Sequence, residues 1–283
     1  MGILSGKVAV ITGGTRGLGL GIARAYVLEG ALVVLASRSQ SSVDAAIREI
    51  DQSGNKVVGM AVDVADLKQV EELAAHAIKS FGRLDIWVNN AGISCPYGPT
   101  IGSSPEDFIR VVDTNILGVY HGSRTAMKYF LSQGSGKLIN VLGHGDSGPV
   151  AWQNAYASSK IWVKSFTMSL AKENEGTGVG VYAFNPGLVL TEMLTDVDVI
   201  EGSEDRLKAF PTIVRMWANP PAVPAKKAVW IASSATDKKT GMVIKILSPG
   251  SMLLGVVKEA IRALKRSAEP EMAISMRRVP YSE

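Results

Sequence analysis

The sequence contains one cysteine and three histidines among its 283 residues. The single thiol, Cys95, excludes an intrachain disulfide framework, so the fold does not depend on an oxidising compartment. The histidines, His76, His121 and His144, are scattered and have no cysteine or carboxylate partner at metal-ligand spacing. We therefore expect no metal site.

Long apolar runs and a focused charge of one sign are also missing. Apolar stretches such as Val8–Ile11 and Ala31–Ala36 have the length of a strand, well short of the ~20 residues that span a bilayer. The segment from Met1 to Lys7 lacks the pattern of a targeting signal, so we expect a cytoplasmic protein with no membrane span. The net charge of +4 is spread along the chain, which argues against a nucleic-acid partner.

What the sequence does contain is an alternation of short, β-branched apolar segments with longer segments of helical periodicity. The apolar segments are continuous, which is typical of parallel strands buried on both faces. Strands are expected at Lys7–Thr12, Ala31–Ala36, Lys56–Ala61, Leu84–Val88, Lys137–Val141, Val179–Phe184 and Met242–Leu247. Helices are expected at Gly17–Glu29, Ser42–Ser53, Leu67–Phe81, Pro105–Asp113, Ile116–Leu131, Ala151–Asn174 and Ala225–Ser234. This order predicts an α/β protein with a doubly wound parallel sheet of the Rossmann type.

We expect residues 1–250 to form a single domain, with residues 251–283 as an extension too short to bury its own core. The stretch Thr191–Pro224 breaks the alternation and is expected to be a long irregular insertion with a functional role. The segment Glu269–Glu283 has little periodicity and is expected to reach a neighbouring subunit or to be disordered.

The extension begins with apolar residues at helical spacing, separated by basic ones. The pattern predicts an amphipathic helix that packs against its own core or a subunit partner, with an anionic membrane surface as the alternative. The apolar positions are Leu253, Leu254, Val257, Ile261 and Leu264.

A glycine-rich turn joins the first strand to the first helix, from Thr12 to Gly19. Glycines allow a tight turn and a close approach of the backbone to a pyrophosphate, which the helix N-terminus can bind through free N–H groups. The turn therefore predicts a dinucleotide site. The residues expected to contact the cofactor here are Gly13, Thr15, Arg16, Gly17, Leu18 and Gly19.

The end of the second strand indicates which dinucleotide binds. NAD sites usually carry an acid there for the ribose 2′-hydroxyl, but this strand ends in Ser37 and Arg38. Arg16 can converge with Arg38, and two guanidiniums suit a 2′-phosphate. We therefore expect NADP(H) in preference to NAD(H).

At this point the sequence resembles the short-chain dehydrogenase/reductase family over about residues 5–250. Its landmarks occur in the family's order, as the glycine turn, Asp63-Val64, Asn89-Asn90-Ala91-Gly92, Asn115, Tyr156-xxx-Lys160 and Pro186-Gly187 followed by Thr191. The resemblance implies a soluble oxidoreductase, a homodimer or homotetramer, that acts on a small molecule. It also implies that Asp63 contacts the adenine beside Val64. Further cofactor contacts implied by the resemblance are Asn90, Ala91, Gly92, Pro186, Gly187, Val189 and Thr191.

The same resemblance makes Tyr156 and Lys160 the catalytic pair. Their i, i+4 spacing puts both on one helix face, where the ammonium is expected to lower the pKa of the phenol. Tyr156 then exchanges a proton with a carbonyl or alcohol, while Lys160 also holds the nicotinamide ribose. Asn115 is implied to support Lys160 through a water-linked relay.

One family landmark is missing, because the serine that usually polarises the substrate is replaced by Gly143. Loss of such a donor typically costs about 10²–10³ in rate. Three explanations stay open: His144 or Ser147 substitutes, the substrate needs no serine, or the protein binds NADP(H) with little turnover. The last leaves a binding protein or a non-redox enzyme, such as a dehydratase or isomerase, as the alternative function. The family geometry directs Gly143, Cys95, Trp152 and Met193 towards a bulky apolar substrate.

Overall fold

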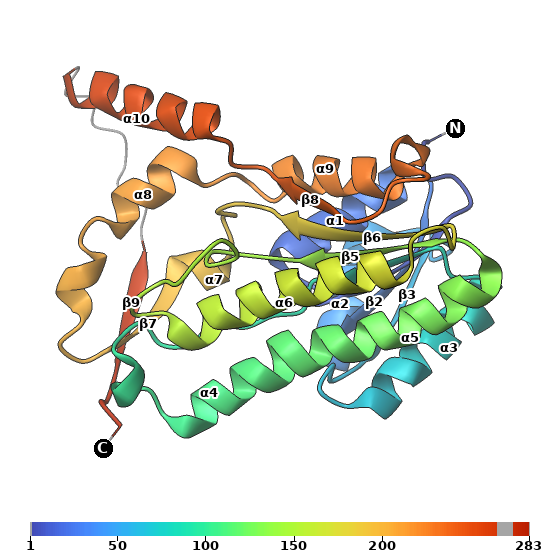
Figure 1. Cartoon of the computed structure of the whole chain (residues 1–283), viewed down its shortest axis with the longest axis horizontal. Helices are drawn as coiled ribbons and strands as arrows, with labels where there is room; N and C mark the ends of the chain where they lie inside the picture. The colour runs from blue at the N-terminus through green and yellow to red at the C-terminus, as the bar shows by residue number, and fades with distance from the viewer. Residues whose placement is uncertain (1, 265–273, 283) are drawn as a thin grey trace.

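The structure is a computed structural model that describes residues 2–264 and 274–282. Seven parallel strands form one sheet in the order β3-β2-β1-β4-β5-β6-β8 (Figure 1). Their bounds are β1 Val8–Thr12, β2 Leu32–Ser37, β3 Val57–Ala61, β4 Ile86–Asn89, β5 Gly136–Val141, β6 Val179–Asn185 and β8 Met242–Lys245. The predicted doubly wound parallel sheet and single domain are confirmed.

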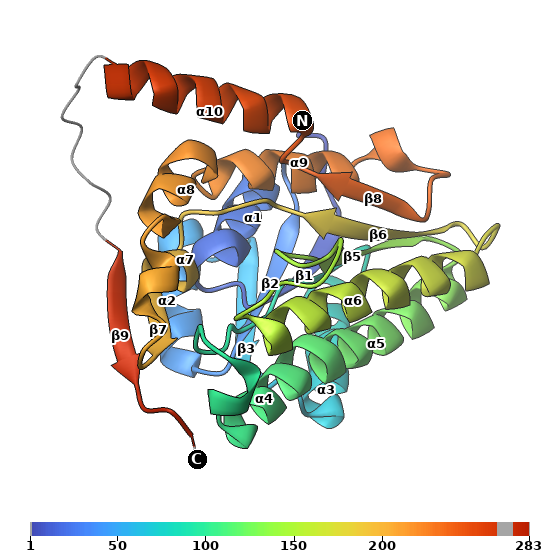
Figure 2. The same ribbon diagram turned by 60° about the vertical axis from the view of Figure 1, so that its left-hand side comes forward.

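Helices cover both faces of the sheet because each strand is apolar on both sides. On one face lie α1 (Gly17–Leu28), α2 (Gln40–Ile50) and α9 (Ala222–Ala232), which share a core with the sheet. On the other lie α3 (Leu67–Phe81), α5 (Gly118–Gln133) and α6 (Asn154–Glu173). Figure 2 shows the resulting three layers. The strand order reverses between β1 and β4, and in such sheets the crevice at this point binds the ligand.

The helical segments predicted at Pro105–Asp113 and Ile116–Leu131 form one continuous rod. It consists of α4 (Pro105–Val111), a π-helical segment at Val112–Leu117, and α5. A π-helical segment is rare and often lies at a functional site.

The prediction of an irregular insertion at Thr191–Pro224 is wrong. This stretch forms α7 (Glu192–Thr195), β7 (Asp196–Ile200), a 3₁₀ turn at Glu204–Leu207 and α8 (Phe210–Trp217). β7 forms a regular strand because it pairs in parallel with β9 (Ser275–Val279). The expectation that the Glu269–Glu283 segment is disordered or reaches another subunit is therefore wrong for β9, while residues 269–273 lie outside the described part.

The predicted amphipathic helix is present as α10 (Pro249–Leu264), but its apolar face does not pack on the core. Gly255 is buried against Trp217 of α8, and Glu259 receives hydrogen bonds from Arg215. Leu253, by contrast, is 66% exposed. α10 thus packs against α8 through the side that carries Gly255 and Glu259. No helix in the described ranges is long and apolar enough to cross a membrane.

Candidate active site

A cavity of about 1750 Å³ runs along the carboxyl ends of the central strands and gathers the predicted site residues. Every residue predicted to contact the cofactor lines it: Gly13, Thr15, Arg16, Gly17, Leu18, Gly19, Ser37, Arg38, Asp63, Val64, Asn90, Ala91, Gly92, Tyr156, Lys160, Pro186, Gly187, Val189 and Thr191. Gly143, His144, Cys95 and Met193 line it too. Among residues 2–264 and 274–282, no cluster of His, Cys, Asp or Glu is arranged to hold a metal.

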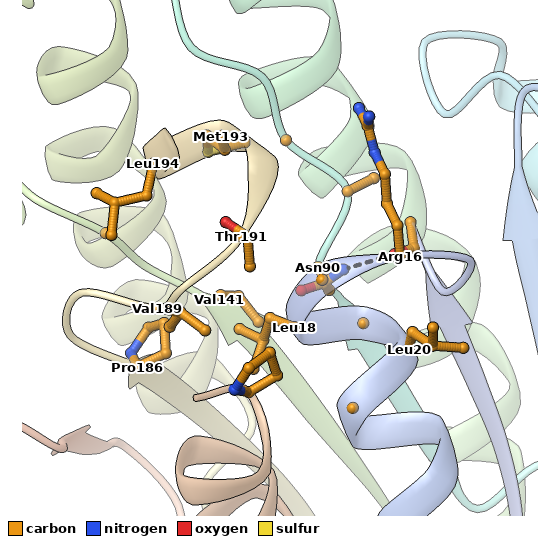
Figure 3. Close-up of a pocket in the computed structure, with 18 of the residues that line it drawn as sticks. Arg16, Leu18, Leu20, Asn90, Val141, Pro186, Val189, Thr191, Met193 and Leu194 are labelled. Carbon is orange, nitrogen blue, oxygen red and sulfur yellow. Dashed lines mark hydrogen bonds between the residues drawn. The ribbon is translucent and has the colours of Figure 1, made fainter. Parts of the chain in front are cut away.

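The glycine turn forms the floor of this cavity, below Thr191 (Figure 3). Gly13 and Gly17 have φ values of 61° and 54°, which side chains rarely adopt. A Cβ on Gly17 would lie 2.9 Å from Thr191 Cγ2, so the turn and the segment above it require a glycine there. No side chain caps the first turn of α1, which leaves its N–H groups available to an anion. The turn fits the pyrophosphate of a dinucleotide.

Asn90 fixes the glycine turn to the end of β4. Its Nδ2 donates to the carbonyls of Thr12 and Gly13, both at 3.0 Å. The Thr12 hydroxyl in turn accepts the N–H groups of Asn90 and Ala91 at 3.1 Å. The two strand ends at the reversal point are therefore held at a defined separation.

Arg38 lies exposed at the ribose end of the cavity, next to Ser37, and no acid ends β2. Arg16 does not join it: Arg16 Nη1 donates to Glu192 Oε2 at 2.6 Å, across the cleft on α7. The predicted convergence of Arg16 with Arg38 is thus absent from the structure. Both partners of this ion pair are well exposed, so it is worth only a few tenths of a kcal/mol to about 1 kcal/mol. Arg16 can turn towards a phosphate at little cost.

Tyr156 and Lys160 lie one turn apart on α6 at the other end of the cavity. Lys160 Nζ is 5.5 Å from the centre of the phenol ring and donates to the Val141 carbonyl at 3.3 Å. Desolvation raises the pKa of Tyr156 to about 12 and lowers the pKa of Lys160 to about 8. The expected lowering of the phenol pKa by the ammonium is therefore outweighed by burial. At neutral pH the site holds a phenol and an ammonium.

Asn115 is fully buried in the π-helical segment and does not line the cavity directly. Its Nδ2 donates to the Ile93 carbonyl at 3.0 Å and to Ser159 Oγ at 3.1 Å, and its Oδ1 accepts the Ile93 N–H at 2.9 Å. A Cβ on Gly92 would lie 3.4 Å from Asn115 Oδ1 and 3.6 Å from Lys160 Nζ. Asn115 therefore fixes the backbone at Gly92 and Ile93, which lies between the Asn115 and Lys160 side chains.

Gly143 accounts for the missing serine in steric terms. A Cβ at this position would overlap the Tyr156 hydroxyl and would lie 3.1 Å from Cζ. The Gly143 carbonyl accepts a hydrogen bond from Asn185 Nδ2 at 3.3 Å, which anchors the turn to β6. The Tyr156 hydroxyl therefore occupies the position that the Cβ of any side chain at residue 143 would need.

The two groups considered as replacements for the serine lie in different places. His144 is exposed and lines the cavity next to Gly143. Ser147 instead donates to Asp146 at 2.8 Å and accepts from Lys245 at 2.7 Å, away from the cavity. Of the two, only His144 can reach a molecule bound beside Tyr156.

The cavity wall also includes Tyr97, Met193 and β7, together with Cys95. Cys95 is buried, and burial raises the pKa of its thiol, so it behaves as a small apolar residue. Trp152 does not line this cavity, contrary to the prediction. Its ring lies 4.7 Å from the Arg206 guanidinium, and its φ is 70°.

Sequence reasoning missed Glu192 and β7. Glu192 follows Thr191 and carried no signal that it pairs with the distant glycine turn. β7 contributes Asp196, Val197 and Asp198 to the cavity wall. Its alternating Asp-Val-Asp-Val pattern is the strand signal that could have located it.

Comparison with known proteins agrees with this geometry. A family model described as short chain dehydrogenase matches residues 7–200. A protein of Arabidopsis thaliana described as a probable chlorophyll(ide) b reductase, chloroplastic, is 34% identical over 272 residues, which cover 89% of this chain and 53% of that protein. The chain thus spans about half the length of this relative.

Two solved structures share the fold over nearly their whole length. The 3-ketoacyl-(acyl-carrier-protein) reductase from Brucella melitensis, complexed with NADH, has a TM-score of 0.76 and 30% identity, covering 86% of this chain and 97% of that one. A variant of actinorhodin polyketide ketoreductase with NADPH has a TM-score of 0.77 and 28% identity, covering 87% of this chain and 97% of that one. Both structures contain a nicotinamide cofactor, NADH in the first and NADPH in the second.

Proposed function

This chain belongs to the short chain dehydrogenase family, and on that premise we propose that it is an NADP(H)-dependent carbonyl reductase in which Tyr156 is the proton donor. One observation carries the proposal: Tyr156 and Lys160 line the same cavity as the glycine turn. A carbonyl compound and a nicotinamide can therefore meet beside the phenol. The family and its ketoreductase neighbours support carbonyl reduction in general.

The preference for NADP(H) rests on Arg38. A guanidinium at the end of β2, with the Ser37 hydroxyl beside it and no competing carboxylate, suits a 2′-phosphate. The remaining contacts would come from the glycine turn for the pyrophosphate, from Asp63 and Val64 for the adenine, and from the Pro186–Thr191 segment for the nicotinamide end. We expect Arg38→Ala to raise the dissociation constant for NADPH by about tenfold or more while leaving that for NADH nearly unchanged. Equal weakening of both would contradict the assignment.

The proposed chemistry assigns each group one task. When bound, NADPH would supply the hydride that reduces the carbonyl carbon. Tyr156 retains its proton at neutral pH, because its pKa is about 12, and can give that proton to the carbonyl oxygen. The charge of Lys160 stabilises the phenolate that results, and His144 can donate a hydrogen bond to the same oxygen.

The cavity favours a bulky apolar substrate. Tyr97, Met193 and Phe210 lie on its wall, which supports an apolar substrate. We propose an aldehyde or ketone with a large apolar body. A homodimer or homotetramer and a cytoplasmic location stay predictions from the sequence.

The deciding experiment is NADPH oxidation by the purified protein against a panel of aldehydes and ketones, from diacetyl to 1-naphthaldehyde. Tyr156→Phe should bind NADPH normally and lose activity by about 10²-fold or more, because it keeps the ring and loses the proton. Turnover that Tyr156→Phe leaves unchanged would exclude Tyr156 as the donor. NADPH binding without oxidation of any compound would favour the alternative of a cofactor-binding protein.

A further inference from the structure

β9 lies along the outer edge of β7 (Figure 2), and β7 contributes Asp196, Val197 and Asp198 to the cavity wall. Its five residues pair in parallel register, from Asp196 with Ser275 to Ile200 with Val279. The Glu201 N–H continues the ladder by donating to the Val279 carbonyl at 3.0 Å. β9 therefore satisfies the backbone groups on the side of β7 that faces away from the sheet.

The other edge of β7 is held by the segment that follows β4. The Tyr97 N–H donates to the Asp198 carbonyl at 2.7 Å, and the Ile200 N–H donates to the Tyr97 carbonyl at 2.9 Å. β7 is thus the middle of three adjacent segments and belongs to a sheet separate from the main one. Because small isolated pairs of strands are marginally stable, the position of β7 depends on both neighbours.

Side chains of β9 extend the attachment beyond β7. Arg277 makes a two-pronged ion pair with Asp198, with distances of 2.8 and 2.7 Å. Arg278 Nε lies 2.8 Å from Glu204 Oε1 in the 3₁₀ turn. The same turn carries Arg206, whose guanidinium covers the Trp152 ring. β9 therefore contacts both the cavity wall and the turn that packs on the segment leading into Tyr156.

The residues after β9 make a second attachment, at Gly102. The Tyr281 ring packs against Gly102, where a Cβ would lie 2.5 Å from it, and the Ser282 N–H donates to the Gly102 carbonyl at 3.1 Å. Gly102 ends a separate 3₁₀ turn, Thr100–Gly102, in which the Thr100 hydroxyl accepts a hydrogen bond from Asn154 Nδ2 at 3.1 Å, at the start of α6. The segment thus connects β7 to the element that carries Tyr156.

We propose that residues 275–282 form a strap that shapes the substrate half of the cavity and so determines which carbonyl compounds bind. The contacts of the strap described above are to β7, to the turn at Glu204–Leu207 and to Gly102, so we expect its main effect on substrate binding. The inference rests on the proposed function, because it assigns the β7 side of the cavity to substrate. The residues of the strap do not react themselves. They are positioning residues that act through β7 and the 3₁₀ turn at Glu204–Leu207.

The test uses two variants of the full-length protein, one ending after residue 274 and one carrying Arg277→Ala. Arg124→Ala is the matched control, since it removes an exposed arginine that pairs with Glu71 on a distant face. Three quantities are measured for each: hydrogen exchange of the amides in β7, the dissociation constant of NADPH, and KM and kcat for 1-naphthaldehyde and diacetyl. Hydrogen exchange and NADPH binding require no turnover.

We expect the β7 amides to exchange faster in both variants, by about tenfold or more in the shortened protein, because their bonds to β9 are lost or weakened. KM for 1-naphthaldehyde should rise by about tenfold in the shortened protein while kcat changes little, and KM for diacetyl should change by about twofold at most. NADPH binding should stay within about twofold of the wild type in all variants.

Unchanged β7 exchange together with an unchanged preference between 1-naphthaldehyde and diacetyl would overturn the strap. An equal loss for both substrates would also overturn it, since a merely structural role predicts no selectivity. If the shortened protein fails to fold, Arg277→Ala and Tyr281→Ala decide by the same measurements. If the wild type reduces neither compound, the proposed substrate class is wrong. Hydrogen exchange of the β7 amides still shows whether residues 275–282 stabilise β7 at the cavity wall.

Discussion

At the scale of single residues, the contact between Gly143 and Tyr156 determines what the active site can contain. The phenol hydroxyl occupies the space that a Cβ on Gly143 would need. The glycine is therefore the residue that admits this tyrosine position, and a decayed serine is not required to explain it. Any donor to the substrate oxygen must come from elsewhere, and His144 lines the cavity beside it.

This arrangement predicts that Gly143→Ser lowers kcat, although it restores the residue usual in the family. The new side chain displaces the phenol, and a misplacement of about 1 Å costs about 10²-fold in rate. The matched control is Gly148→Ser in the same turn, where a Cβ would meet nothing within 4 Å. Steady-state NADPH oxidation checks both. A gain of activity in Gly143→Ser would show that the site had lost a needed donor.

The pH profile gives a second test at this scale. The pKa of Lys160 is lowered to about 8, so its ammonium is charged below that pH and neutral above it. Tyr156 keeps its proton throughout, because its pKa is raised to about 12. We therefore expect kcat/KM for reduction, which reports the free enzyme, to fall as the pH rises through about 8. In Lys160→Met the rate should be lower and this descending limb absent; a limb that persists would assign it to another group.

At the scale of elements, α10 is attached through the side of the helix that is least apolar. Gly255 packs under Trp217, whose indole Nε1 donates to the Met252 carbonyl at 3.1 Å. Glu259 accepts two hydrogen bonds from Arg215, at 2.5 and 3.1 Å, which hold its pKa below the usual range. Attachment therefore depends on the close approach that a glycine permits.

We expect Gly255→Ala to loosen α10 from α8, since a Cβ there would lie 2.6 Å from the Trp217 ring and 2.8 Å from the Met216 carbonyl. Overpacking of this kind costs about 1–3 kcal/mol, so tryptic cleavage at Lys258 should accelerate by about tenfold. Gly250→Ala is the control, because its Cβ would meet only Ser248 Oγ, at 4.0 Å. Equal cleavage rates in the two variants would mean that this contact does not hold the helix.

The elements that could be predicted from the sequence are those with a strong local pattern. The continuous apolar runs located all seven strands of the main sheet, because burial on both faces imposes that composition. β7 and β9 were missed since each is stabilised by a partner far away in the sequence. The π-helical segment at Val112–Leu117 has no distinctive composition, and Asn115 stood out only by resemblance.

At the scale of the whole molecule, one sheet supports two chemically different halves of a single cavity. The residues predicted for the half beside α1 and α2 all line the cavity, because a tight turn imposes glycines at set places, but Arg16 pairs with Glu192 and does not converge with Arg38. In the other half, Gly143, Cys95 and Met193 line the cavity as expected, whereas Trp152 lies outside it and β7 within it. Side chains there are set by tertiary contacts that no short motif specifies.

A cofactor that binds only the folded state should stabilise the entire domain. At an NADPH concentration of about 100 times its dissociation constant the gain is about 2.7 kcal/mol, which raises Tm by about 5–10 °C for a chain of this size. NADH at the same concentration should raise Tm less, and Arg38→Ala should remove most of the difference. Differential scanning fluorimetry measures all three. An identical shift from both cofactors in the wild type would argue against a preference for NADP(H).

The pairing of β7 with β9 also has a consequence for the order in which the protein matures on the ribosome. The chain emerges N-terminus first, so the glycine turn and the central strands leave the exit tunnel while the β9 segment is still inside it. The backbone groups on one edge of Asp196–Ile200 then have no strand to pair with until Ser275–Val279 has been synthesised. A nascent chain should thus become able to hold its dinucleotide before it can discriminate between substrates.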